Sequence, residues 1–228
     1  MVQYITAAAG LLAVLGSPLG YRLGLPLGLA FLFLIAGLVA LSVALVLVLV
    51  ALVKGSGLSG YGTIVVVSVS VAVLSATAWN IVGSGRTPAI HDITTDLQDP
   101  PQFIAVIPLR GTGENSVEHA GQKLATIQAQ AYPDIKTLTA PYGFDRAVKR
   151  ALSVVGQMGW EIVFADEESG HIEATDTTFW FGFKDDVVIR VRRLNDANSL
   201  IDLRSGSRVG VGDLGANANR IKAFLSRF

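Results

Sequence analysis

The sequence contains no cysteine, which excludes disulfide bonds, thiolate metal sites and cysteine nucleophiles. No serine lies in a GxSxG pattern, and the Gly-Lys-Ser or Gly-Lys-Thr ending of a phosphate-binding loop is missing. The histidines His91, His119 and His171 follow no spacing typical of a zinc site. The sequence therefore predicts no cofactor and no metal, and no standard catalytic motif supports an enzyme.

Charge is also scarce, at 16% of the residues, and the mean hydropathy of +0.51 is too high for an ordinary soluble protein. Residues 23–53 and 55–85 carry no acidic or basic side chain, and each window exceeds the roughly 20 apolar residues that cross a bilayer core. We predict transmembrane helices at about 27–53 and 61–81. A third is predicted at about 2–19, where a cleaved signal peptide is the alternative although no basic residue precedes the apolar run.

These features divide the chain into a transmembrane anchor (1–83), a linker (84–89) and a soluble domain (90–228). The loops between the spans carry one basic residue each, Arg22 and Lys54, so the positive-inside rule favours neither membrane orientation strongly. We expect an integral protein of the bacterial inner membrane with Lys54 inside and the C-terminal domain on the periplasmic side. The lipid bilayer is its first predicted partner.

The soluble part has balanced charge, since 16 of the basic residues and all 18 acidic residues lie from Arg86 onward. Phosphate neutralisation requires a basic face, so nucleic acid is not a predicted partner.

Hydrophobic periodicity predicts an α+β domain in this part. Residues 90–115 are expected to be extended chain over a core, and the apolar stripe of 144–158, which ends at Gly159, predicts an amphipathic helix. Further helices are predicted at 117–131 and 218–228, and strands at 160–165, 171–178, 179–183, 187–194 and 199–203. Short turns allow only antiparallel neighbours, so we expect an antiparallel sheet with helices packed on one face.

Arginines alternate with apolar residues in the last two predicted strands. Arg190 and Arg192 share one strand face, and the NDAN turn brings Asp202 opposite or diagonal to them. The pattern fits either a solvated face with cross-strand ion pairs or a surface that binds anions.

A glycine-rich loop follows, with amides that lead into the last helix. Glycines free its backbone for close approach to an anion, while a plain strand-to-helix connection is the structural alternative. The predicted anion-binding or partner-binding residues are Arg190, Arg192, Arg204, Ser205, Ser207, Arg208, Gly210, Gly212 and Arg220.

Acidic residues offer a second possible site. The catalytic candidates are Asp185, Asp186, Asp202, His91 and Asp92, because carboxylates and histidine serve as acids, bases or ligands of a hard metal. Neighbouring strand residues point to opposite faces, however, so Asp185 and Asp186 are poorly placed to chelate one ion together.

Several motifs carry a family resemblance. HDITTD, DPPQF, GWEI, HIEATDTTFWFGFKDDVVIRV and DLRSGSRVGVGDLGANANRI resemble an uncharacterised bacterial and plastid domain of unknown function, over about residues 90–228. The resemblance implies a membrane-associated or exported domain, with the preceding spans as a membrane extension, and it supplies no catalytic residues.

Three functions remain open. The preferred hypothesis is a membrane-anchored, non-enzymatic domain that binds an anionic ligand, an anionic lipid headgroup or a membrane-protein partner. The alternatives are a hydrolase or transferase that acts on a membrane-associated substrate, and a structural subunit of a membrane complex.

Overall fold

The computed structural model describes residues 1–55, 60–84 and 87–228. The chain divides into two units, Met1–Arg86 with Phe179–Gly182, and Thr87–Thr178 with Phe183–Phe228. The loop expected after Lys54 and the linker expected at 84–89 each lie partly outside the described residues, at 56–59 and 85–86.

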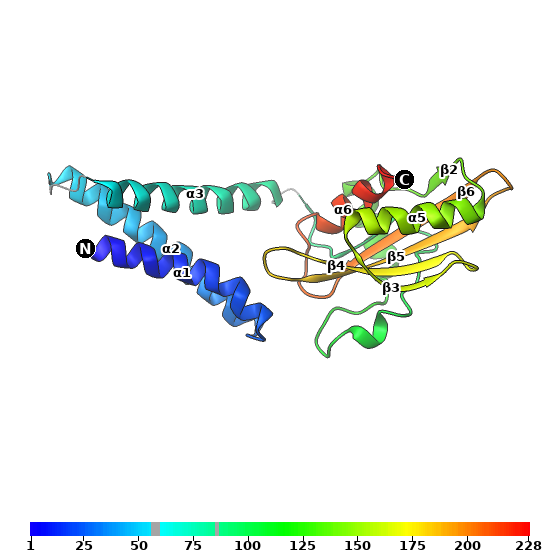
Figure 1. The fold of residues 1–228 in the computed structure, drawn as a ribbon, viewed down its shortest axis with the longest axis horizontal. Coiled ribbons are helices and arrows are strands. Elements are labelled where there is room, and N and C mark those ends of the chain that lie inside the picture. The colour runs from blue at the N-terminus through cyan, green and yellow to red at the C-terminus, as the bar shows by residue number, and fades with distance from the viewer. Residues whose placement is uncertain (56–59, 85–86) are drawn as a thin grey trace. The chain divides into compact units, whose positions relative to one another are not determined.

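Three helices make up almost all of the first unit: α1 (Val2–Arg22), α2 (Leu27–Val53) and α3 (Tyr61–Ser84) (Figure 1). All three are long and apolar enough to cross a membrane, which confirms the predicted membrane extension. The first helix continues beyond the predicted end to Arg22 and contains Pro18. Next to this proline, the Ser17 hydroxyl donates a hydrogen bond to the Ala30 carbonyl of α2, at 2.6 Å.

Glycines allow α1 and α2 to pack closely. A Cβ atom at Gly10 would lie 2.9 Å from the Gly37 carbonyl oxygen, and one at Gly37 would lie 2.7 Å from the Gly10 carbonyl oxygen. Small residues at such positions let two helix backbones approach in lipid, where no hydrophobic driving force joins helices. The pair therefore sets how closely α1 and α2 pack.

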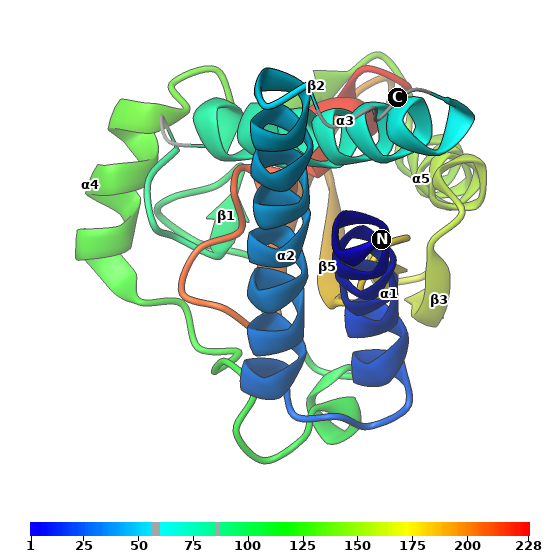
Figure 2. The same ribbon diagram turned by 90° about the vertical axis from the view of Figure 1, so that its left-hand side faces the viewer.

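Six antiparallel strands form the sheet of the second unit, in the order β1-β6-β5-β4-β3, with β2 also paired to β6. Figure 2 shows β1 and β3 on opposite sides of the domain, in agreement with this order. The α+β class is thus confirmed. The strands are β1 (Asp92–Thr94), β2 (Leu138–Ala140), β3 (Glu161–Asp166), β4 (His171–Thr177), β5 (Lys184–Arg193) and β6 (Ser199–Ser207).

Helices α5 (Phe144–Met158) and α6 (Ala216–Leu225) pack on one face of this sheet. The apolar stripe of α5 has the predicted bounds, and Gly159 ends the helix in the left-handed conformation that glycine adopts without strain, at φ 72°. Val187, Ile189 and Val191 point from β5 toward these helices and belong to the same apolar core.

An irregular covering segment, residues 95–118, lies over the opposite face and contains only the short 3-10 helix η1 (Ile107–Leu109). Phe103 and Val106 of this segment pack on Val188, which points away from α5. Extended chain laid over a core was expected at residues 90–115, and the structure is close to this expectation. The short strand β1 within that range was not predicted.

Other boundaries differ from the prediction. Residues 179–183 form a turn rather than a strand, because β4 and β5 already pair directly up to Thr177 and Lys184. Strand β6 runs on through Gly206 to Ser207, where a glycine loop was expected. Helix α4 (Gly121–Ala131) begins four residues later than predicted, and the short strand β2 was not predicted.

Candidate functional site

The first predicted feature, the pairing of Arg190 and Arg192 with Asp202, is present. Arg190 and Asp202 are direct partners in the β5–β6 register, and Asp202 Oδ2 lies 3.1 Å from Arg190 Nη2 and 2.6 Å from Arg192 Nη2. Arg190 also reaches Asp99 in the covering segment, with Nη1 to Oδ2 at 2.7 Å. Burial alone would lower the pKa of Arg190, but the hydrogen bonds and charges of Asp202 and Asp99 raise it. The Arg190 guanidinium is therefore already paired with carboxylates of the same chain.

Arg204 is buried and paired with Asp92. Its Nε and Nη2 donate to the Asp92 carboxylate at 2.9 and 2.8 Å, and the remaining donors reach the carbonyls of Pro101 and Val117. The guanidinium lies over the Phe103 ring, 4.9 Å from its centroid. The Arg204 side chain of β6 thus contacts the covering segment at two places, Pro101 in its first part and Val117 near its end.

Asp186 collects a second pair of guanidinium groups. Arg208 Nη2 and Arg110 Nε each lie 2.8 Å from one of its carboxylate oxygens, and Thr175 donates to it at 2.8 Å. Arg208 in turn donates to the Leu109 carbonyl of η1. These contacts hold the middle of the covering segment on the sheet.

The Glu173 carboxylate also binds this segment. It accepts hydrogen bonds from the amides of Ile104, Ala105 and Val106 at 2.7 to 2.9 Å, and His171 Nε2 lies 2.7 Å away. Burial would raise the pKa of Glu173, but the hydrogen bonds from His171 and the three amides outweigh it and hold the pKa below its ordinary value.

Arg220 lies on the helix side of the sheet. It pairs with Asp185 at 2.6 Å and Asp176 at 2.8 Å, and Nη1 donates to Ser205 Oγ and Asn217 Oδ1. Burial raises the pKa of Asp185 despite the Arg220 charge. Asn217 also donates to Ser207 Oγ at 2.9 Å.

The predicted anion-binding residues therefore do not form one exposed face. Arg204, Arg208 and Arg220 are buried and bonded to carboxylates, while Arg192 keeps 40% of its side chain exposed. Gly210 gives its carbonyl to Asn115 Nδ2, and a Cβ at Gly212 would lie 3.1 Å from Ala89 Cα. Most of the set holds the domain together.

The catalytic candidates do not converge either. Asp185, Asp186 and Asp202 each pair with different arginines, and only His91 and Asp92 line a common cavity. Within the described ranges, no group of three or more metal-ligating side chains occurs. The geometry offers no support for the hydrolase or transferase hypothesis.

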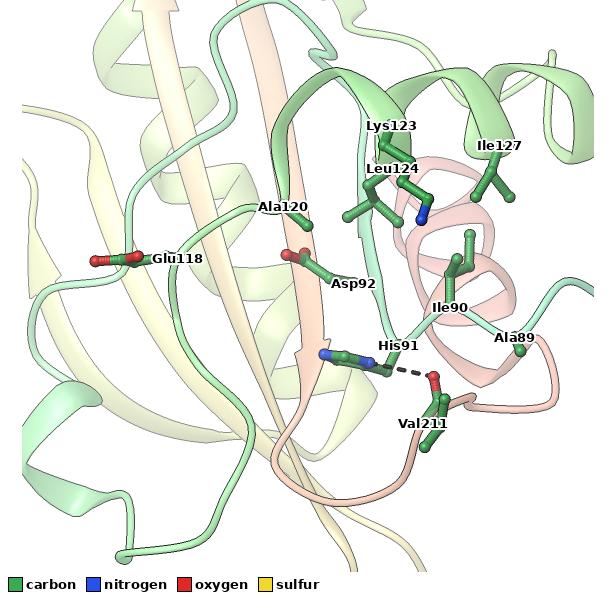
Figure 3. A pocket seen from close by; sticks show the side chains of 10 residues that line it. All are labelled: Ala89, Ile90, His91, Asp92, Glu118, Ala120, Lys123, Leu124, Ile127 and Val211. Carbon is green, nitrogen blue, oxygen red and sulfur yellow. Dashed lines mark hydrogen bonds between the residues drawn. The ribbon is translucent and has the colours of Figure 1, made fainter.

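That cavity, here called the α4 pocket, has a volume of about 240 Å³. Ile90, Leu124 and Ile127 give it apolar walls, and Val211 closes one side (Figure 3). Its polar lining comes from His91, Asp92, Glu118 and Lys123. The pocket lies between the start of β1, the first turns of α4 and the β6–α6 connection.

Two kinds of positively polarised group border the α4 pocket: the ammonium group of Lys123 and the first backbone amides of α4. Lys123 makes no ion pair among the residues that the structure describes, and its ammonium group points into the space between Asp92 and Ile90 (Figure 3). Helix α4 has no side-chain hydrogen bond from its N-cap residue, Ala120. The Gly121 amide donates to His119 Nδ1 at 3.2 Å, and the other amides of the first turn lack intrahelical acceptors.

The negative groups are placed differently. Arg204 neutralises Asp92, while the carboxylate of Glu118 points away from the other lining side chains in Figure 3. His91 Nδ1 lies 3.3 Å from the Val211 carbonyl oxygen, which fixes the ring at the pocket wall. The α4 pocket therefore combines apolar walls with a positively polarised end.

Comparison with known families adds the identity of the domain. Residues 92–228 match the family described as "Protein of unknown function (DUF1499)". The chain belongs to the DUF1499 family. The match begins at Asp92, the first residue of β1, so it covers the folded domain and none of the three apolar helices. No curated protein matches the chain.

Sequence reasoning found part of the pocket of this DUF1499 domain. His91 and Asp92 were candidates, but Lys123, Leu124 and Ile127 were not singled out. A signal was present in residues 119–124, HAGQKL, because the helix begins at Gly121 after Ala120, which has no capping side chain, and carries a lysine in its first turn, where acids are preferred.

Proposed function

We propose that the DUF1499 domain is a membrane-tethered binding module that takes a small anionic ligand with an apolar body into the α4 pocket. The observation that carries the proposal is Lys123, an exposed lysine that makes no ion pair among the described residues and whose ammonium group points into a cavity with aliphatic walls. Ligand sites are commonly concave and mostly apolar, with a few convergent polar groups that fix orientation.

Size and charge support this class of ligand. An apolar cavity of ~150 Å³ is known to bind benzene, so a pocket of about 240 Å³ has room for a short acyl or aryl group. Lys123 and the first amides of α4 favour a carboxylate or phosphate at one end. Asp92 does not oppose it, because Arg204 already neutralises that carboxylate.

We further propose that the domain lies on the periplasmic side of a bacterial inner membrane. The third span separates Lys54 from the C-terminal domain, so Lys54 on the cytoplasmic side, as the positive-inside rule favours, supports a periplasmic domain. This orientation gives the pocket access to solutes of the periplasm.

Hexanoate and its neutral analogue hexanamide serve as probes, titrated into the full chain in nanodiscs and followed by saturation-transfer NMR, with empty nanodiscs subtracted. We expect hexanoate to bind more tightly than hexanamide. Lys123→Gln is expected to weaken hexanoate by roughly tenfold, which corresponds to about 1.4 kcal/mol.

Lys149→Gln is the matched control, because Lys149 is an exposed lysine of α5 outside the pocket. Its affinity for hexanoate should equal that of the unmodified chain. Equal affinity in the Lys123 variant, or no hexanoate signal above empty nanodiscs, would refute the proposal.

A further inference from the structure

One end of the sheet carries three connections. Across the strands, Asp92 pairs with Gly206, Gly206 with Asp186, and Asp186 with Thr175. The chain therefore enters β1, leaves β6 and turns from β4 into β5 at the same end of the sheet, beyond this line of paired residues. The chain that comes from the membrane helices joins the domain at this end.

Exposed apolar side chains gather in the connections at this end. Phe179 is 90% exposed and Trp180 46% exposed in the β4–β5 turn, and Val211 and Leu214 are exposed in the β6–α6 connection. Isolated exposed apolar residues are ordinary on a protein surface. Two aromatic rings at a hairpin tip, on the end where the membrane tether attaches, are not isolated in this sense.

The tether limits how far this end can lie from lipid. Seven residues separate Ser84, the last residue of α3, from Asp92. Even a fully extended chain of this length reaches only about 30 Å, at roughly 3.3–3.6 Å per residue. The β4–β5 turn lies at the same end of the sheet, and its residues Phe179–Gly182 group with the three apolar helices in the first unit.

We propose that this end of the domain is a membrane-docking surface, with the rings of Phe179 and Trp180 inserted among the lipid headgroups. Tryptophan prefers this zone, because its ring is amphipathic and its indole N–H finds polar partners there. Lys184, exposed at the start of β5, adds a positive charge that suits anionic headgroups. The docking rings of Phe179 and Trp180 do not line the α4 pocket, although Val211 belongs both to the pocket wall and to this end of the domain.

Tryptophan fluorescence tests the proposal in the full chain. In a Trp79→Phe background the remaining tryptophans are Trp180 and the buried Trp160. In nanodiscs of lipid brominated near the headgroup end of its acyl chains, we expect most of the Trp180 emission to be quenched, relative to nanodiscs of unbrominated lipid.

The Trp79→Phe/Trp180→Phe variant retains Trp160 alone, and its emission should be unchanged by bromine. Phe179→Asp in the Trp79→Phe background should restore much of the quenched emission, since a carboxylate resists insertion. Emission of Trp180 that is equal in both lipids would overturn the proposal, because the ring would then lie outside the bilayer.

Discussion

On one face of the sheet, α5 and α6 bury aliphatic side chains against Val187 and Ile189; on the other face, carboxylates and guanidinium groups hold an irregular segment. The helices satisfy their own backbone groups, so apolar contact is sufficient to attach them. The covering segment has free carbonyls and amides instead, and buried backbone groups need partners. Arg204, Arg208 and Glu173 supply these partners.

The largest expected effect comes from the polar face. Arg204→Met leaves Asp92 buried without its counterion and frees the carbonyls of Pro101 and Val117. We expect a loss of about 3–5 kcal/mol in the free energy of unfolding, as for other broken buried pairs. Urea unfolding of the detergent-solubilised chain, followed by near-ultraviolet circular dichroism, measures it.

The double variant Arg204→Met/Asp92→Leu is the control for this prediction. It removes both charges, so it should be more stable than the single variant, because no buried charge is left unpaired. A double variant that is less stable than the single one would contradict the assignment of the loss to an unpaired Asp92 carboxylate.

The helix-covered face gives the second expected effect. Ile189→Ala opens a cavity beneath α5, since Ile189 is fully buried in the apolar core. The expected loss is about 2–5 kcal/mol. It should be the same at pH 7 and pH 5, because no titratable group changes its partner. A loss that depends on pH would mean that the two faces are coupled.

Glu173→Gln, on the polar face, is expected to have the smallest effect. It should lower the free energy of unfolding by about 1.5–3 kcal/mol at pH 7, because the three amides lose a charged acceptor. The folded-state pKa of Glu173 lies below the ordinary value of 4.5. Its contribution is therefore complete above about pH 4.5 and is lost as the pH falls through the folded-state pKa.

Unfolding midpoints of the unmodified chain and the Glu173 variant should consequently converge as the pH is lowered from 7 toward 3. Parallel midpoints over this range would contradict the assignment of Glu173 as an ionised acceptor.

Local patterns explain what the sequence predicted well. The apolar stripe and Gly159 define α5 to the residue, and uncharged runs longer than a bilayer core identify the three apolar helices. The NDAN turn fixes the β5–β6 register, which sets Arg190 opposite Asp202. Each of these signals lies within about one or two elements of the chain.

Long-range pairing explains what was missed. Asp92 and Arg204 lie 112 positions apart, and Asp99 and Arg190 lie 91 apart. The acids come from a proline-rich stretch without periodicity, so nothing local marks them as counterions of arginines near the C-terminus. The α4 pocket was missed for the same reason, since Ile90, Leu124 and Val211 meet only after folding.

The grip of Arg204 on the carbonyls of Pro101 and Val117 also orders events during biosynthesis. The ribosome makes residues 95–118 long before Arg204 and Arg208, yet these two arginines donate to the carbonyls of Pro101, Leu109 and Val117. Residues 95–118 therefore lack these hydrogen-bond donors until the later part of the chain has been synthesised. The covering segment can therefore be held on the sheet only after β6 and Arg208 have been synthesised.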